Sequence, residues 1–175
     1  MRKQTLSFGF VIFILVMGMT SVQSTVPLRG TMDLQFNLGY PGPQADIPDW
    51  VGHITIDGHQ YGMAFFNIGT GKPFDSQNSG KNVFFGELWF IYESITLQFN
   101  DNGVLTSWSN GSVLLAGNDQ GVVTLANFKY HMNGEVTTAR GGFQAYLGNQ
   151  VHMSGEIQWY SFGAPRNAPG EFRIN

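Results

Sequence analysis

Two histidines stand in nearly the same local sequence. "YHMNGEV" contains His131 and "VHMSGEI" contains His152, so a His-Met-small-Gly-Glu pattern occurs twice, 21 residues apart. Imidazole and carboxylate groups are ligands for transition metals, and a repeated pattern could supply two halves of one site. The same repetition is also typical of strands that occupy equivalent places in a sheet. Whether the two copies can form one site therefore depends on the strands and turns in which they lie.

The dipeptide Asn133-Gly134 predicts that the two histidines lie far apart. Asn-Gly between strand-forming residues is a strong signal for a hairpin, because both residues tolerate the positive φ of a tight turn. Such a turn would place His131 and His152 near opposite ends of a three-stranded meander, roughly 30 Å apart at about 3.4 Å per residue. Metal ligands must lie within a few ångströms of a common centre, so we expect no metal site here.

The strongest candidate for a site is an apolar face in the second half of the chain. If the adjacent glycines Gly141-Gly142 form a β-bulge, the register shifts by one residue and the apolar sides of neighbouring strands meet. The ligand-binding residues predicted on this face are Phe128, Tyr130, Glu135, Tyr146 and Trp159. One interpretation is a hydrophobic pocket in which the polar groups of Tyr130, Glu135 and Trp159 orient the ligand. The other is a packed core with Glu135 in solvent.

Other residues offer little for chemistry. His53 and His59 flank the dipeptide Asp57-Gly58, where a solvated hairpin is favoured over a His-Asp-His metal site. Glu87 and Glu93 share one predicted strand but would lie about 20 Å apart, too far for a pair of catalytic carboxyls. We therefore assign no catalytic residue, no metal and no cofactor.

Three tryptophans keep a carbohydrate-binding role open. Trp50, Trp89 and Trp108 are spread over the first two thirds of the chain, and exposed indole rings can stack on sugar rings. This alternative would fit a β-sandwich with aromatic side chains on its surface.

Composition limits the class of protein. A length of 175 residues suits one domain, and the absence of cysteine excludes disulfides and thiolate chemistry. Only 12% of residues are charged and the formal net charge is −3, so nucleic acid is not an expected partner. Glycine (23 residues) and phenylalanine (15 residues) are abundant.

Residues 1–24 have the three-part form of an export signal. Arg2 and Lys3 are followed by the apolar run "FGFVIFILVMGM" and then by the small and polar residues "TSVQS". The apolar run is shorter than the ~20 residues of a permanent membrane helix, which favours cleavage after Ser24; an uncleaved anchor is the alternative. We expect a secreted or surface-tethered protein whose domain is residues 25–175.

From Thr25 onward the sequence predicts an all-β fold. The stretch "TMDLQFNL" alternates apolar and polar residues, and turn signals recur at Asp57-Gly58, Asn102-Gly103 and Gly148-Asn149. Proline and glycine crowd two predicted loops, which begin at Gly39 and Gly69. The spacing predicts a single antiparallel β-barrel of about 8–10 strands in a meander, with a β-sandwich as the alternative.

The stretch "GVVTLANFKYHMNGEVTTARGGFQAYLGNQVHMSGEIQWY" (121–160) resembles the second half of small calycin-type or dirigent and allene-oxide-cyclase-like barrels. The resemblance implies an eight-stranded barrel, in some cases oligomeric, with a hydrophobic cavity for a small organic molecule. The Gly-x-Trp strand start of lipocalins is missing, and no catalytic residue of the dirigent or cyclase families can be placed on this chain. The resemblance concerns architecture and transfers no active site.

These observations lead to one expected function and two alternatives. We expect a secreted or cell-surface barrel that binds a small hydrophobic molecule, as a binding or structural module rather than an enzyme. The first alternative is a cyclase or isomerase in which Glu135 or Tyr130 is the polar group, and the second is a carbohydrate-binding sandwich. The expected partner is a small hydrophobic molecule, with membrane contact only through residues 1–24 if they are uncleaved, and a homo-oligomer is compatible with the sequence.

Overall fold

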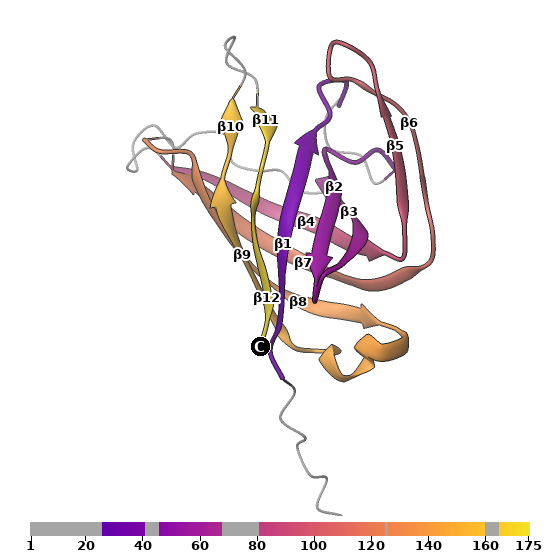
Figure 1. Cartoon of the computed structure of the whole chain (residues 1–175). Helices are drawn as coiled ribbons and strands as arrows, with labels where there is room; N and C mark the ends of the chain where they lie inside the picture. Colours follow the sequence, from indigo (N-terminus) through magenta and orange to yellow (C-terminus); the bar gives the residue numbers. More distant parts are fainter. Residues whose placement is uncertain (1–25, 41–45, 68–80, 125, 160–164) are drawn as a thin grey trace, which may run out of the picture.

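The chain folds into a closed antiparallel β-barrel of eight strands (Figure 1). The computed structural model describes residues 26–40, 46–67, 81–124, 126–159 and 165–175. The predicted export signal and most of the loop that begins at Gly69 lie outside the described residues. The predicted fold class, an all-β antiparallel barrel, is therefore confirmed, and the sandwich alternative is wrong.

Eight strands form the barrel wall. In chain order they are β1 (Leu28–Phe36), β2 (Trp50–Ile56), β3 (His59–Asn67), β4 (Lys81–Tyr92), β7 (Val113–Thr124), β8 (Lys129–Ala139), β9 (Gln150–Glu156) and β12 (Gly170–Ile174). Neighbours around the wall follow the order β1-β2-β3-β4-β7-β8-β9-β12. The wall closes because β1 pairs with β2 on one side and with β12 on the other. Closure leaves no free sheet edge in this ring.

Two short strands extend the wall at one end. β10 (Gln158–Trp159) pairs with β11 (Pro165–Asn167), and β11 pairs with the last part of β1 through Asn167 and Gln35. They lie at the end of the barrel at which β1, β3 and β7 finish.

A hairpin packs on the outside of the barrel. β5 (Ile95–Phe99) and β6 (Leu105–Asn110) form a separate two-stranded sheet beside β2 and β3 (Figure 1). Its Trp108 ring lies 5.9 Å from Phe66 and 6.3 Å from Tyr92, both of which point outward from the wall. The hairpin thus buries apolar side chains that would otherwise face water, giving the molecule a second hydrophobic cluster outside the barrel.

Apolar side chains fill most of the barrel interior. Trp89 is fully buried at its centre and packs edge-on against Phe172, with ring centroids 5.6 Å apart. A Cβ atom on the neighbouring Gly117 would lie 2.5 Å from the indole ring, so glycine at this position makes room for the tryptophan. An eight-stranded barrel is just wide enough for side chains of this size to meet across it.

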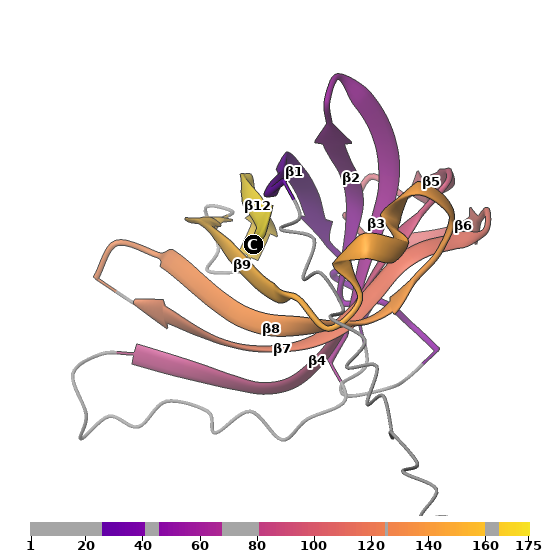
Figure 2. The same ribbon diagram turned by 90° about the horizontal axis from the view of Figure 1, so that it is seen from below.

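The 3₁₀ helix η1 (Gly141–Tyr146) lies across one end of the barrel, as Figure 2 shows from below. Phe143 packs edge-on against Tyr61, with ring centroids 6.0 Å apart, and Tyr146 donates a hydrogen bond to the Val26 carbonyl at 3.0 Å. Both η1 side chains contact the main core cluster. This end of the barrel is therefore covered by the chain itself.

Two predicted hairpin turns are confirmed. Asp57 and Gly58 have φ values of 50° and 79° and join β2 to β3, as expected for an Asp-Gly turn. Gly103 has a φ of 74° in the loop that joins β5 to β6. At these positions the local signal and the tertiary structure agree.

The predicted hairpin at Asn133-Gly134 is wrong. β8 runs without interruption through both residues, which pair with Gln120 and Asp119 of β7. Neither residue has a positive φ; the chain reverses before β8, where Phe128 has a φ of 56°. Gly134 is needed for a different reason, because a Cβ atom there would lie 1.9 Å from the Asn118 carbonyl oxygen.

The predicted bulge at Gly141-Gly142 is also wrong. These glycines begin η1, and Gly141 takes a φ of 57° at its start. The strand that was expected to pass through these glycines ends before them, at Ala139. The aromatic and glycine residues of this segment therefore form a cover for the barrel end and not a strand of its wall.

Because β8 continues through Asn133 and Gly134, the two histidines lie closer together than the sequence predicted. In the antiparallel pair of β8 and β9, Met132 lies opposite Met153, so the two copies of the motif are related by a local twofold axis. His131 lies opposite Ser154, and His152 lies opposite Asn133, with which it forms a 2.6 Å hydrogen bond. Both histidines point outward on neighbouring strands, and the expected separation of roughly 30 Å is wrong.

Candidate functional site

The five residues predicted to bind a ligand do not share one face. Tyr130 is buried inside the barrel, whereas Glu135 on the same strand is exposed on the outside. Phe128 and Trp159 pack against each other at the rim, with ring centroids 5.0 Å apart, and both are about one third exposed. Tyr146 lies in η1, at the covered end of the barrel. The shared face depended on the bulge, which the structure does not contain.

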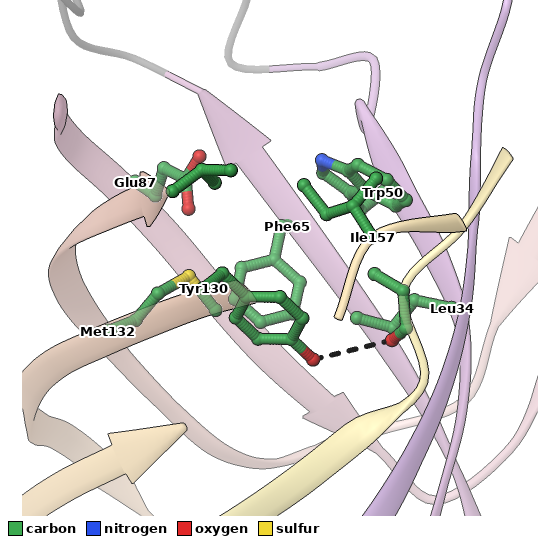
Figure 3. Close-up of a pocket in the computed structure, with 9 residues that line it drawn as sticks. Leu34, Trp50, Phe65, Glu87, Tyr130, Met132 and Ile157 are labelled. Atoms are coloured by element: carbon green, nitrogen blue, oxygen red, sulfur yellow. Dashed lines mark hydrogen bonds between the residues drawn. The ribbon is translucent and has the colours of Figure 1, made fainter. Parts of the chain in front are cut away.

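A small cavity lies inside the barrel, away from η1 (Figure 3). Its lining residues are Leu34, Trp50, Phe65, Glu87, Val123, Tyr130, Met132, Ile157 and Ala168. Glu87 lies on one side of the cavity, and Trp50 and Ile157 lie on the other. The volume of about 30 Å³ is enough for one or two water molecules or a small chemical group. The rest of the interior is filled by side chains.

Tyr130 forms part of the cavity floor and is held in place by glycines. Its hydroxyl donates to the carbonyls of Ala168 and Pro169 at 3.4 and 3.3 Å. Cβ atoms on Gly155 and Gly170 would lie 2.5 and 2.0 Å from this hydroxyl, so only glycine fits beneath the ring. Burial raises the pKa of Tyr130, which therefore stays neutral at physiological pH.

Two carboxyl groups face each other on the inner wall. Glu87 of β4 and Asp119 of β7 are directly opposite each other across the strand pair, next to an irregularity in the register at residues 85–87. Side chains at such positions have Cβ atoms about 5 Å apart, and two like charges there repel. Glu87 is 4% exposed and Asp119 is 5% exposed. A bulge beside a functional residue commonly turns its side chain toward a site.

When both groups are ionised, neither carboxylate oxygen of Asp119 has a hydrogen-bond donor in the part of the chain that the structure describes. Glu87 lies within hydrogen-bonding reach of Asp119, so a protonated Glu87 carboxyl can donate to the Asp119 carboxylate. No described arginine, lysine or histidine lowers the pKa of either group. The described part of the chain therefore supplies no positive charge to compensate this acidic pair.

A third buried carboxyl, Asp49, immediately precedes β2. Its Oδ1 accepts the Trp50 amide at 3.0 Å, and the Asn67 amide also stabilises its charged form. Asp49 is close enough to raise the pKa values of Glu87 and Asp119 through its charge. The three acidic residues thus form one electrostatic unit beside the cavity, which we call the inner acidic cluster.

Burial dominates the titration of this cluster. Desolvation disfavours a charged carboxylate, and it raises the pKa values of Asp49 and Asp119 from 3.8 to about 7. Burial, followed by the charges of Asp119 and Asp49, raises the pKa of Glu87 well above its usual value. Near neutral pH the cluster therefore retains protons that exposed carboxyls would have lost.

The sequence-based reasoning missed this cluster because of one strand boundary. It divided the segment "VLLAGNDQGVVT" into two strands and so placed Asp119 in a turn. The segment is in fact one strand, β7, with Asp119 at an inward position. The signal that could have revealed it is an acidic residue in register with buried apolar positions, here Leu115 and Val123.

The remaining sequence candidates do not assemble a site. His53 and His59 lie on the two strands of the β2–β3 hairpin, and Nδ1 of His59 lies 3.2 Å from the Asp57 carbonyl oxygen. Among the described residues, no group of three or more His, Asp or Glu side chains is arranged to hold a metal ion. Glu93 is exposed beyond the end of β4. Within the same ranges, no helix is long and apolar enough to cross a bilayer.

The tryptophans proposed for sugar stacking are not exposed. Trp89 is fully buried. Trp108 is part of the outer hairpin and packs, partly buried, against the barrel wall, and Trp50 is half-buried beside the cavity. The surface stacking platform required for carbohydrate binding is therefore not formed by these three side chains.

The fold places the chain in the class of eight-stranded antiparallel β-barrels, an architecture compatible with the calycin type. No protein-family model, curated protein or solved structure that was compared with the chain gave a match.

Proposed function

We propose that this protein binds a small, largely apolar molecule at the end of the barrel opposite η1. The observation that carries the proposal is the cavity lined by Trp50, Phe65, Tyr130 and Glu87. Small-molecule sites are typically apolar and aromatic, with a few polar groups that orient the ligand. Eight-stranded barrels have enough interior space for one such ligand.

The size of the cavity defines how the ligand would bind. A volume of about 30 Å³ accepts one small group of the ligand, not a whole drug-sized molecule. The apolar body would then contact Trp50, Phe65 and Ile157. Of the residues predicted from sequence, Tyr130 lines this cavity, and the other four do not.

The resemblance to calycin-type and cyclase-like barrels supports the same proposal at the level of architecture, since those barrels hold small organic molecules. The export-signal pattern in residues 1–24 supports a secreted or surface-tethered location. An exported carrier of a small apolar molecule would be consistent with both features.

Acid-base catalysis is the second candidate function, and one observation favours it. Glu87 and Asp119 are opposed carboxyls with raised pKa values beside an apolar cavity, and such pairs can hold and transfer a proton near neutral pH. In a cyclase or isomerase this pair would be the polar group, in place of the exposed Glu135.

Tryptophan fluorescence tests the binding proposal. The protein would be titrated with neutral primary alcohols of four to eight carbons, and we expect a saturable change in emission. The response should disappear in Trp50→Phe, because Trp50 lines the cavity, and persist in Trp108→Phe, because Trp108 lies outside the barrel. A chain-length series with no saturable response would contradict the proposal.

A further inference from the structure

The inner acidic cluster has no counter-ion among the described side chains. Asp49, Glu87 and Asp119 are each at most 5% exposed, and no described basic side chain forms an ion pair with any of them. A buried charge is costly unless it is paired and hydrogen-bonded. Glu87 and Asp119 also sit directly opposite each other, where like charges repel. Ionisation of the cluster therefore lowers the stability of the fold.

A nearby buried residue shows how this chain satisfies a structural polar group. Asn37 is 2% exposed, yet its Oδ1 accepts the amides of Gly39 and Leu105 at 3.0 Å, and its Nδ2 donates to the Pro48 carbonyl at 3.2 Å. Asn37 thus fastens the outer hairpin to the barrel. Asp119 is as deeply buried, but the described residues offer its ionised carboxylate no donor other than a protonated Glu87. Buried unsatisfied groups in a native fold call for an explanation such as a ligand.

The groups around the cavity match one ligand chemistry. Glu87 places a carboxyl at the cavity, and the faces of Trp50, Phe65 and Tyr130 surround the same space (Figure 3). Carboxylates pair with ammonium groups, and aromatic faces attract cations. An ammonium group also matches the small volume of the cavity.

We propose that the barrel binds a primary ammonium group carried on an apolar body, with Glu87 as its direct counter-ion and Asp119 as the residue that sets the charge of Glu87. This inference rests on the proposed function, because it names the chemical class of the ligand for the same cavity. The three N–H donors of an ammonium group would include one for the Glu87 carboxylate, which lines the cavity.

Ligand binding is then coupled to proton release. Among the described residues, the titratable groups near Glu87 and Asp119 are each other, Asp49 and, in the cavity wall beside Glu87, Tyr130; Leu34 and Phe65 add apolar surface to this wall. Without a ligand, the cluster holds protons near pH 7. A bound cation favours the charged carboxylates and displaces a proton. Ammonium affinity should therefore rise between pH 5.5 and pH 8.

Matched probes separate this inference from the proposed function. The full chain would be titrated by calorimetry at pH 8 with primary alkylammonium ions of four to eight carbons and with alcohols of the same lengths. We expect the ammonium ion to bind about tenfold or more tightly than the alcohol, the range for a hydrogen bond to a charged group. Measurements in phosphate and HEPES at pH 7 should show release of about one proton per ammonium bound.

Three variants test the assignment of residues. Glu87→Gln and Asp119→Asn keep the side-chain shape and should lose most of the ammonium preference while still binding the alcohol. Glu156→Gln is the control, because Glu156 is exposed on the outside of β9 opposite Lys129, and it should keep the preference. Circular dichroism would confirm that each variant folds. The comparison of ammonium ion and alcohol in the unmodified protein tests the inference even if a variant fails to fold.

The outcomes are distinct. If alcohols bind as tightly as ammonium ions, the ammonium inference is wrong and the proposed apolar site remains. If neither probe binds, both are wrong. If Glu156→Gln loses as much of the ammonium preference as Glu87→Gln and Asp119→Asn, the preference comes from surface charge. That result would contradict the assignment of Glu87 and Asp119 to the site. Saturable Ca²⁺ or Mn²⁺ binding that excludes the ammonium ion and is lost in Glu87→Gln would replace the organic cation by a metal.

Discussion

At the scale of single residues, the inner acidic cluster and Asn37 show two ways in which this barrel treats buried polar groups. Asn37 has every hydrogen-bonding atom engaged and holds the outer hairpin in place. The described residues offer the ionised Asp119 carboxylate no donor other than a protonated Glu87, and burial raises the pKa of Asp119 to about 7. The first arrangement stabilises the fold, whereas the second costs stability whenever the carboxyl is ionised.

This difference predicts an unusual pH dependence of stability. Because the folded-state pKa of Asp119 lies above its ordinary value of 3.8, the folded protein binds more protons than the unfolded chain between about pH 4 and pH 7. Stability is therefore highest at low pH in this window and falls as the pH rises, by up to about 1.4 kcal/mol per pH unit for each retained proton. Urea denaturation should give a free energy of unfolding that is lower at pH 8 than at pH 5 by at least ~2 kcal/mol.

Asp119→Asn isolates the contribution of this residue. The amide is neutral at every pH, so the variant should be more stable than the natural protein at pH 8 and should lose part of the pH dependence. Glu156→Gln, on the exposed side of β9, should leave the slope unchanged. A natural protein whose stability rises from pH 5 to pH 8 would contradict the prediction.

The glycines beneath Tyr130 give a second prediction at this scale. A Cβ atom on Gly170 would lie 2.0 Å from the Tyr130 hydroxyl and 2.5 Å from the Ser154 carbonyl oxygen. Gly170→Ala should therefore destabilise the protein by about 2–4 kcal/mol through overpacking and strain.

Gly142→Ala is the matched control. No atom lies within 4 Å of the added methyl group, and Gly142 has no positive φ, so stability should stay within about 1 kcal/mol. Chemical denaturation of the two variants measures the difference. Equal effects would mean that Tyr130 does not lie over Gly170.

At the scale of elements, the outer hairpin and η1 complete the barrel in different ways. The hairpin β5–β6 covers the outward-facing Phe66, Phe90 and Tyr92. η1 covers one end of the interior through Phe143 and Tyr146. Both elements bury apolar surface that an eight-stranded wall alone would expose, and the other end retains the cavity.

The hairpin's contribution can be measured at Trp108. Its ring packs against Phe66 and Tyr92, so Trp108→Ala should lower the free energy of unfolding by about 3 kcal/mol, the range for a large side chain removed from a packed cluster. Trp159→Ala should cost less than about 1 kcal/mol, because Trp159 is 37% exposed and meets Phe128 at the rim. A larger loss of unfolding free energy in Trp159→Ala than in Trp108→Ala would contradict the placement of Trp108 in a packed cluster and of Trp159 at the exposed rim.

At the scale of the whole molecule, the alternation of "TMDLQFNL" and the Asp57-Gly58 turn predicted an antiparallel barrel correctly. These signals are local, since side-chain period and backbone sterics act within a few residues. Asn133-Gly134 misled the reasoning because its glycine meets a requirement of the neighbouring strand, the close approach of the Asn118 carbonyl. That requirement exists only after β7 and β8 are paired.

The candidate site depended on the same long-range pairing. Tyr130 was predicted because it lies on an apolar side of its strand, and it does line the cavity. Asp119 was missed because its inward position follows from the full length of β7 and from its register with β4. Neither the opposition of Glu87 and Asp119 nor their burial can be predicted from spacing along the chain.

Carbon-detected NMR titration of the side-chain carboxyls, without ligand and with a saturating alkylammonium ion, tests the central claim most directly. The claim is that Glu87 and Asp119 form a buried acidic pair at a ligand cavity, with no basic partner among the described residues. The account predicts that without ligand Asp119 titrates with a pKa near 7 and Glu87 with a pKa well above its usual value, and that both pKa values fall when the ammonium ion binds. Ordinary pKa values for both carboxyls in the ligand-free protein, or raised values that the ammonium ion leaves unchanged, would contradict it.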